Sequence, residues 1–355
     1  MSIEAPHSPG ETETRPAKRH LVLKIGTAAV CGLVAETATI LAIDTSVTQA
    51  LEVPHGPSVA ILDQHITTTQ NPVATMRSEQ ADPMLVERCR ESRFVVLIID
   101  GTGLPTSFYT GNQLNEIVNE LGGCIMFVVK GTEYDEQALA QEIKSAINNV
   151  TPEGETKHVV GIGQSEGGII LEDMLTNPIL ENADNLIFDK AIFLMTPIDM
   201  NDVKQTIFGI PAAWLDAWPG ELPKYGNLVV LINAINGQRL RGDLGDPREW
   251  GFTFENASKT DPNTMRADVE RVRAGMRRFN PNIDIDYVAT PEDETVDNSK
   301  AIQRLVDMMR QAGGTGRVNV HWLPASIKHD GCWQAENAPT CNDVALEPAI
   351  ASTRQ

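Results

Sequence analysis

The sequence predicts an α/β fold in which helices cover both faces of a mostly parallel central sheet. Two observations lead to this prediction. Short continuous apolar runs recur along the chain, and such runs are typical of strands buried on both faces of a parallel sheet. Segments with apolar residues at helical spacing lie between these runs and are joined to them by short connections. Strands and helices that alternate in this way require right-handed crossovers and therefore a parallel sheet.

The first half of the predicted sheet leads up to a glycine-rich turn around Ser165. Each strand in this half is followed by an amphipathic helix. The expected elements are, in chain order, a strand at 93–99, a helix at 111–122, a strand at 124–129, a helix at 139–150, a strand at 157–162 and a helix at 169–175. Residues 44–90 are rich in Thr, Gln, Pro and Asp, so we expect a linker with at most one edge strand, at 59–62.

The second half of the sheet is interrupted by an insertion at about residues 198–280. Apolar residues and three prolines between 200 and 226 fit either a lid over a substrate pocket or a helical excursion packed on the core. Five arginines between 265 and 279 predict a helix with a solvated face paired with carboxylates, or alternatively a site for an anionic ligand. The other expected elements are strands at 191–195, 228–235, 283–289 and 317–323 and a helix at 302–309.

The stretch Gly163-Gln164-Ser165-Glu166-Gly167 matches the pattern G-x-S-x-G, with a predicted strand before it and a predicted helix after it. A serine at a sharp strand-to-helix turn has a strained backbone, and small neighbours let the strand and helix approach closely. Gly163 and Gly167 meet that need. The N–H groups at the start of the helix point toward the place where a negatively charged oxygen would develop. The pattern therefore indicates a serine nucleophile.

A serine nucleophile needs a base, and the base needs a carboxylate to orient it. In an open parallel sheet these groups lie in loops beyond the C-terminal ends of the strands. His329 follows the last predicted strand, and an acidic loop at 290–297 follows the strand before it. Asp293 in that loop is the expected acid. Asp297 in the same loop and Asp199 after an earlier strand remain alternatives.

These motifs resemble those of the α/β-hydrolase superfamily over residues 93–335, and we assign one domain to 91–335. Residues 163–167 resemble the nucleophile elbow. Residues 290–296 resemble the acid loop G-x-x-D-x-x-V with Thr in place of Gly, and 329–331 resemble the histidine loop. Residues 100–103 are similar to the oxyanion loop, with Asp where many members have His. No subfamily is identified.

The resemblance implies a serine hydrolase that cleaves an ester or related acyl bond of a small molecule. Ser165 would attack the carbonyl carbon, His329 would take and return the proton, and Asp293 would hold His329. The backbone N–H groups of Glu166 and Thr102 would bind the oxyanion. We expect no cofactor and no metal. A serine peptidase or a thioesterase on the same fold is an alternative, and so is a non-catalytic surface protein that binds through residues 200–280.

The composition limits the class of protein and its partners. The chain has 355 residues, of which 41% are hydrophobic and 22% charged, enough for one large or two modest globular domains. Its formal net charge of −19 argues against nucleic acid as a partner, because phosphate binding relies on clustered Lys and Arg.

The N-terminal residues predict export or membrane anchoring. Residues 1–20 form a polar tail with basic residues at its end, and residues 21–43 form an apolar segment long enough to cross a bilayer as a helix. We expect a signal anchor or export signal with the catalytic domain outside the cytoplasm, and the sequence leaves its cleavage open. The alternative is an amphipathic or buried helix, because Glu36 near the middle is costly in a membrane.

The cysteines fit an exported protein. Cys31 lies in the apolar segment, and the four others allow three pairings. These four are Cys89, Cys124, Cys332 and Cys341. We expect a bridge between Cys332 and Cys341, beside a predicted C-terminal tail at 336–355, if the compartment is oxidising. Free thiols are the alternative.

Overall fold

A computed structural model describes most of the predicted hydrolase domain. The described residues are 57–61, 83–99, 101, 114, 116–129, 135–204, 206–207, 210–211, 270–293, 295–327, 329, 332 and 337–352. Outside them lie the predicted polar tail 1–20, the apolar segment 21–43, Thr102 and the strand expected at 228–235. Across the described part of the chain, no helix is both long and apolar enough to cross a membrane.

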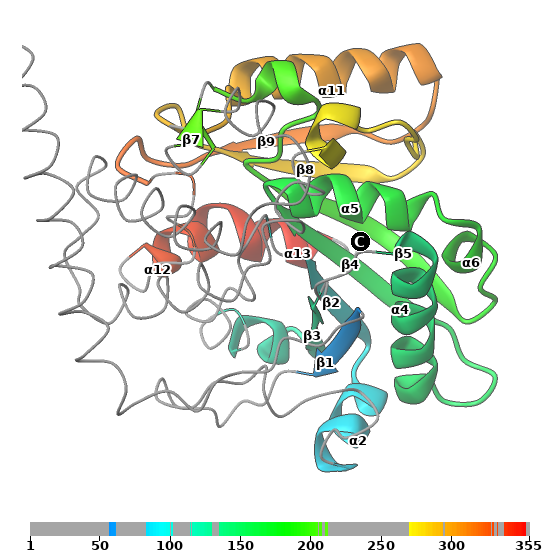
Figure 1. The fold of residues 1–355 in the computed structure, drawn as a ribbon. Coiled ribbons are helices and arrows are strands. Elements are labelled where there is room, and N and C mark those ends of the chain that lie inside the picture. The colour runs from blue at the N-terminus through cyan, green and yellow to red at the C-terminus, as the bar shows by residue number, and fades with distance from the viewer. Residues whose placement is uncertain are drawn as a thin grey trace, which may run out of the picture. The chain divides into compact units, whose positions relative to one another are not determined.

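Within the described residues, seven strands form one sheet in the order β1-β3-β2-β4-β5-β8-β9 (Figure 1). The strands are β1 (Ser58–Ile61), β2 (Phe94–Ile99), β3 (Gly123–Val129), β4 (Lys157–Gln164), β5 (Leu186–Leu194), β8 (Asp284–Ala289) and β9 (Val318–Trp322). The edge strand β1 is antiparallel to β3, and every other neighbouring pair in this sheet is parallel. The predicted strands therefore lie in a mostly parallel sheet.

Side chains that alternate along the strands fill two separate cores. In β2, Val95, Leu97 and Ile99 belong to one buried cluster, and Val96 and Ile98 belong to the other. Successive residues of a strand point to opposite faces, so a strand covered on both sides needs apolar residues at every position. This is why the apolar runs in the sequence are continuous.

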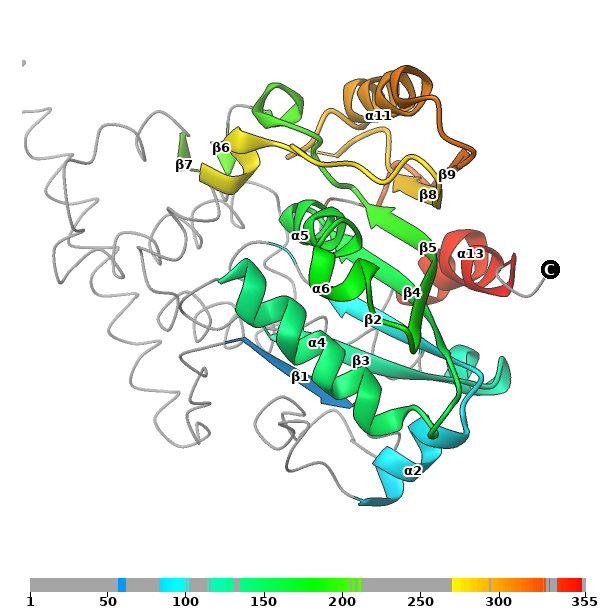
Figure 2. The same cartoon turned by 90° about the vertical axis from the view of Figure 1, so that its right-hand side faces the viewer.

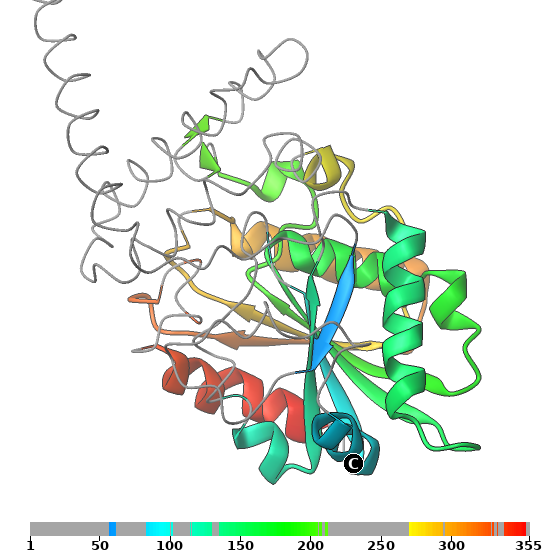
Figure 3. The ribbon, with the colours of Figure 1, turned by 60° about the horizontal axis from the view of Figure 1, so that its bottom comes forward.

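Helices cover both faces of the sheet. One core includes side chains of the helices α2 (Pro83–Glu91), α4 (Glu136–Val150), α5 (Glu166–Leu175), α6 (Pro178–Glu181) and α11 (Asn298–Ala312). The other includes Leu114, Val118 and the helical residues 338–351, which are α12 (Ala338–Cys341), the π-helical turn η5 (Asn342–Leu346) and α13 (Glu347–Ala351). In Figures 2 and 3, α4 and the red α13 lie on opposite sides of the sheet.

The structure differs from the predicted C-terminal tail at 336–355. Residues 338–351 are helical, and Leu346 and Ile350 are fully buried against the sheet. The Cys332–Cys341 disulfide, with Cα atoms 5.5 Å apart, joins this segment to the loop that contains His329. The expected bridge is therefore present, and it holds a segment that completes the core.

The helix expected at 265–279 ends earlier than predicted. Of its described residues, 270–274 are helical, and Gly275 leaves the helix with a φ of +65°. The backbone then follows the loop after β5, because the N–H of Met276 donates to the carbonyl of Ile198 at 3.0 Å. A left-handed φ ends a helix and suits glycine. The predicted pairing of basic side chains with carboxylates is confirmed, since Arg271 contacts Glu166 and Arg278 contacts Glu136.

The insertion begins with short irregular elements. After β5 come the 3₁₀ turn η3 (Met200–Asp202) and an antiparallel pair, β6 (Thr206–Ile207) and β7 (Ile210–Pro211). Residues 212–269, where the lid or helical excursion was expected, lie outside the described residues.

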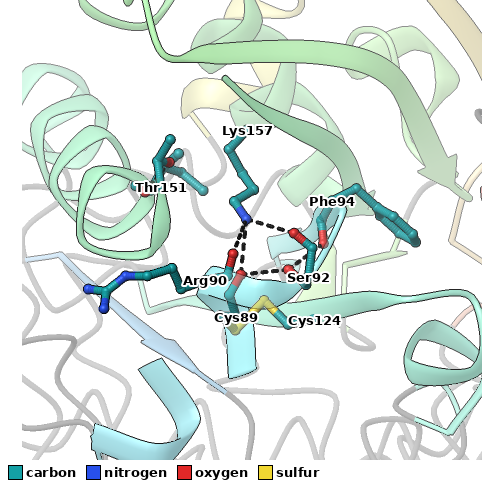
Figure 4. Close-up of a disulfide and its surroundings, with 8 residues drawn as sticks. Cys89, Arg90, Ser92, Phe94, Cys124, Thr151 and Lys157 are labelled. Atoms are coloured by element: carbon teal, nitrogen blue, oxygen red, sulfur yellow. Dashed lines mark hydrogen bonds between the residues drawn. A yellow bond between two sulfur atoms is a disulfide. The ribbon is translucent and has the colours of Figure 1, made fainter. Parts of the chain in front are cut away.

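A buried lysine and a disulfide fix α2 against the sheet (Figure 4). Cys89 at the end of α2 is bonded to Cys124 of β3. The ammonium group of Lys157 donates to the carbonyl oxygens of Cys89, Arg90 and Ser92 at 3.1, 3.1 and 2.7 Å. The last carbonyl groups of a helix carry partial negative charge, so a cation satisfies them well. Lys157 thus anchors α2 to the start of the strand that leads to Ser165.

Glu172 is buried on the inner face of α5. Its Oε1 accepts a hydrogen bond from the backbone N–H of Asn280 at 2.5 Å. Burial, opposed by that hydrogen bond, raises the pKa of Glu172 from 4.5 to about 8. The folded protein therefore holds a proton on Glu172 at neutral pH, where the unfolded chain has released it.

We predict that Glu172→Gln makes the stability of the protein less dependent on pH. The stability contributed by the bound proton is complete below pH 4.5 and is lost as the pH rises through about 8. Between these pH values the wild type should lose on the order of a few kcal/mol more unfolding free energy than the variant. Urea unfolding of both proteins across this range measures the difference. Parallel curves for the two proteins would show that Glu172 is ionised in the folded state.

Candidate active site

Ser165 lies at a strained turn between β4 and α5. Its φ of 50° and ψ of −124° are in a region that side chains rarely adopt, and its side chain makes no capping hydrogen bond to α5. The turn is held by a hydrogen bond from the Ser165 N–H to the carbonyl of Leu194 on β5, at 2.8 Å. The neighbouring strand therefore fixes the backbone while the hydroxyl stays available.

Two glycines allow α5 to lie directly against the sheet. A Cβ atom on Gly163 would be 2.5 Å from the Cα of Gly168 and 2.6 Å from the carbonyl oxygen of Gly167. A Cβ on Gly168 would be 2.2 Å from Oγ1 of Thr196, beyond the end of β5. No side chain fits at either position. The sequence pattern identified Gly163 correctly, and the structure adds Gly168 as the contact with β5.

The turn after β2 lies beside Ser165. A Cβ atom on Gly101 would be 3.0 Å from the Cβ of Ser165 and 3.7 Å from its Oγ. The segment that resembles an oxyanion loop therefore begins next to the serine. Thr102, the expected donor in this segment, lies outside the described residues, as does Asp100.

Asp293 and His329 form a buried hydrogen-bonded pair. Nδ1 of His329 is 2.9 Å from Oδ2 and 3.1 Å from Oδ1 of Asp293, and both residues are at most 5% exposed. Asp293 follows β8 and His329 follows β9. Because β4, β8 and β9 are parallel strands of one sheet, their C-terminal ends lie on the same side of it. Ser165, Asp293 and His329 all follow these C-terminal ends.

The loop around Asp293 favours the ionised carboxylate. Oδ1 accepts hydrogen bonds from the N–H groups of Thr295 and Val296, each at 2.8 Å. Burial acts to raise the pKa of Asp293, but His329 and these two N–H groups outweigh it and hold the pKa below its usual value. An ionised Asp293 accepts a hydrogen bond from Nδ1 of His329, which favours the tautomer in which Nε2 can accept a proton.

The two alternative acids have other partners. Asp297 caps α11 through the N–H of Lys300 and pairs with the ammonium group of that residue at 2.8 Å. Asp199 caps η3 and pairs with Arg304 at 2.7 Å. The structure therefore brings Asp293, rather than Asp297 or Asp199, to His329.

Buried polar residues that no sequence pattern indicated support Asp293 from behind. The side-chain amide of Asn298 donates to Oδ2 of Asp293 at 3.1 Å and to the carbonyl of Thr290 at 2.9 Å. The hydroxyl of Tyr287 lies 3.0 Å from Oδ1 of Asn298 and donates to the carbonyl of Thr196 at 2.6 Å. These contacts connect the acid loop to the end of β5, where Thr196 packs on α5.

Ser165, Asp293 and His329 follow the parallel strands β4, β8 and β9, in the chain order Ser, acid, His found in α/β hydrolases. The chain has the α/β-hydrolase fold. The predicted fold is thereby confirmed for the described residues. In the same part of the chain, no group of three His, Cys, Asp or Glu residues is arranged to hold a metal ion.

Comparisons with known proteins find similarity only to solved structures of low sequence identity. No protein-family model and no curated protein sequence matches the chain. Among solved structures, a lipase in its open form is 16% identical, with 74% of this chain and 89% of the lipase covered and a TM-score of 0.48. The esterase RhEst1 from Rhodococcus sp. ECU1013 is 15% identical, with 73% and 90% covered and a TM-score of 0.45. The carboxylesterase CesB from Bacillus subtilis is 12% identical, with 70% and 82% covered and a TM-score of 0.45. At such identities the similarity concerns the path of the backbone.

We predict that Gly168→Ala destabilises the protein through a clash with Thr196. Forcing a methyl group into this contact should lower the unfolding free energy by about 1–3 kcal/mol. Thr196→Ala removes the atoms nearest to the new methyl group, so the double variant should lose less stability than the two single variants added together. Denaturant unfolding of the four proteins measures this coupling. Strictly additive losses would place Gly168 and Thr196 out of contact.

Proposed function

We propose that this protein is a serine hydrolase that cleaves an ester or related acyl bond. The observation that supports the proposal best is the buried hydrogen-bonded pair of Asp293 and His329. This pair follows the C-terminal ends of strands parallel to the one that leads to Ser165. A histidine oriented by an ionised carboxylate is the base that a serine hydroxyl requires. The strained turn that keeps the hydroxyl free of α5 gives that base a nucleophile to activate.

In the proposed reaction, Oγ of Ser165 attacks the carbonyl carbon of the substrate and its proton moves to Nε2 of His329. The resulting imidazolium is stabilised by Asp293 at Nδ1. The imidazolium then protonates the departing alcohol, and an acyl group remains on Ser165. Water, deprotonated by His329, releases the acid and restores the serine. No cofactor is needed for these steps.

The backbone around Ser165 provides the charge stabilisation that this reaction needs. A negatively charged oxygen develops on the attacked carbonyl, and donors directed at it contribute most of the catalysis. We assign these donors to the N–H of Glu166, the first residue of α5, and to an N–H of the turn after β2, which the sequence assigns to Thr102. Gly101 beside Ser165 supports the second assignment.

A fluorophosphonate probe tests the proposal directly. The probe reacts with an activated serine, so we expect stoichiometric labelling of the wild type at Ser165, located by peptide mass spectrometry. A panel of p-nitrophenyl esters with different acyl chains, together with peptide and thioester substrates, then distinguishes an esterase from a peptidase or thioesterase. A folded wild-type protein that takes up no label would favour a non-catalytic binding protein.

We predict that Ser165→Ala abolishes the turnover of a p-nitrophenyl ester while the thermal midpoint changes by only a few degrees. A half-buried hydroxyl contributes little to the core, so the loss is chemical rather than structural. Steady-state kinetics and differential scanning fluorimetry measure the two quantities. Turnover close to that of the wild type would rule out Ser165 as the nucleophile.

We predict that Asp293→Asn lowers turnover by on the order of a thousandfold or more, because the imidazolium loses its stabilising charge and the histidine its favoured tautomer. Asp297→Asn and Asp199→Asn are matched controls that should stay within about tenfold of the wild type, since their charges act only through screened solvent. Measured kcat values for the three variants decide between the acids. A severe effect of Asp199→Asn alone would move the acid to the end of β5.

A further inference from the structure

The residue whose N–H is a proposed oxyanion donor, Glu166, also forms a buried ion pair through its side chain. The side chain of Glu166 is fully buried, and its Oε1 accepts a hydrogen bond from Nη1 of Arg271 at 3.0 Å. The Arg271 side chain is 11% exposed. A buried carboxylate or guanidinium is costly unless it is paired, so each of the two side chains stabilises the other. The pair joins the residue after the nucleophile to a segment 105 positions later in the chain.

The segment that carries Arg271 is itself attached to the sheet. The helical residues 270–274 end at Gly275, and a Cβ atom on Gly275 would be 2.9 Å from the carbonyl oxygen of Ile198. The N–H of Met276 donates to the same carbonyl. Arg271 therefore lies four residues before a close approach of the backbone at Gly275 and five residues before the hydrogen bond of Met276, both to the loop after β5.

The negative charge of the Glu166 side chain affects the stability of the oxyanion in the proposed reaction. Glu166 contributes its N–H to the oxyanion site in that reaction, and its own carboxylate is a buried negative charge on the same residue. A negative charge close to a developing oxyanion opposes its formation, and the low polarity of a buried site strengthens this opposition. A positive charge held against the carboxylate offsets it. The start of α5 favours a carboxylate there but does not cancel its charge.

We infer that Arg271 is a positioning residue of the active site, which neutralises Glu166 and fixes the N–H of that residue toward the oxyanion. The inference rests on the proposed serine hydrolase function. It predicts an asymmetry between the two members of the pair. Losing Arg271 leaves excess negative charge beside the oxyanion, whereas losing the charge of Glu166 leaves excess positive charge. An ion pair that only stabilises the fold predicts no such asymmetry in kcat per folded molecule, because neither loss would then act on the oxyanion.

The test compares the hydrolysis of a p-nitrophenyl ester by Arg271→Met, Glu166→Gln, the double variant and Arg271→Lys. All rates are divided by the fraction of protein that a fluorophosphonate labels at completion, so unfolded molecules do not count. We expect Arg271→Met to lower kcat about 10- to 100-fold with little change in KM, because the oxyanion exists only after binding. Arg271→Lys keeps the positive charge and should retain most of kcat.

Glu166→Gln tests the effect of removing the negative charge of the pair. We expect its kcat to exceed that of Arg271→Met by about tenfold or more, and we expect the double variant to recover most of the kcat that Arg271→Met loses, because the negative charge beside the oxyanion is then removed together with the positive one. Arg278→Met is the matched control: its guanidinium pairs with Glu136 on α4, and its loss should leave kcat unchanged.

The outcomes separate this inference from the function on which it rests. If the wild type neither takes up label nor hydrolyses esters, both proposals fail. If the wild type is active but Arg271→Met and Glu166→Gln lose kcat equally, and the double variant does not recover, the serine hydrolase stands and the role of Arg271 is overturned. A kcat of Arg271→Met equal to that of the wild type, after division by the labelled fraction of each protein, overturns it as well.

Discussion

The close approach of α5 to the strands β4 and β5 is the constraint on which the rest of the site depends. It requires residues without side chains at Gly163 and Gly168, and it forces Ser165 into a backbone conformation that is otherwise unfavourable. Strain of this kind persists only where the surroundings compensate for it. Here the compensation comes from the hydrogen bond between the Ser165 N–H and the carbonyl of Leu194, and from the burial of most side chains of α5.

The same contact connects the serine turn to the acid. Thr196 packs on Gly168 of α5, and its carbonyl accepts the hydroxyl of Tyr287, which lies beside Asn298. Asn298 in turn donates to Asp293. Residues that lie up to 130 positions apart in the chain are thus positioned by one continuous set of buried contacts. A change at any member should be transmitted to its neighbours, since close-packed interiors deform little.

The sequence was sufficient for the features that depend on local pattern. Continuous apolar runs located strands such as β2 and β3, because a strand covered on both sides has no solvent-exposed face. The motif around Ser165 predicted the turn, because only small residues fit beside it. Residues 338–351 escaped prediction because their buried face is built largely of alanine and cysteine, which carry a weak apolar signal. Asn298 and the contact between Arg271 and Glu166 could not be predicted, since each depends on partners brought together by the fold.

The position of residues 338–351 has a consequence for how the protein is made. Leu346 and Ile350 complete one face of the sheet, and Lys190 in the middle of β5 donates to the carbonyl of Ala349. A ribosome adds these residues long after the turn at Ser165 has been synthesised. The growing chain therefore presents an uncovered apolar sheet face until residue 351 has emerged, and its histidine loop stays untethered until Cys341 is available to Cys332. Synthesis that stops early should yield a chain prone to aggregation rather than a smaller folded protein.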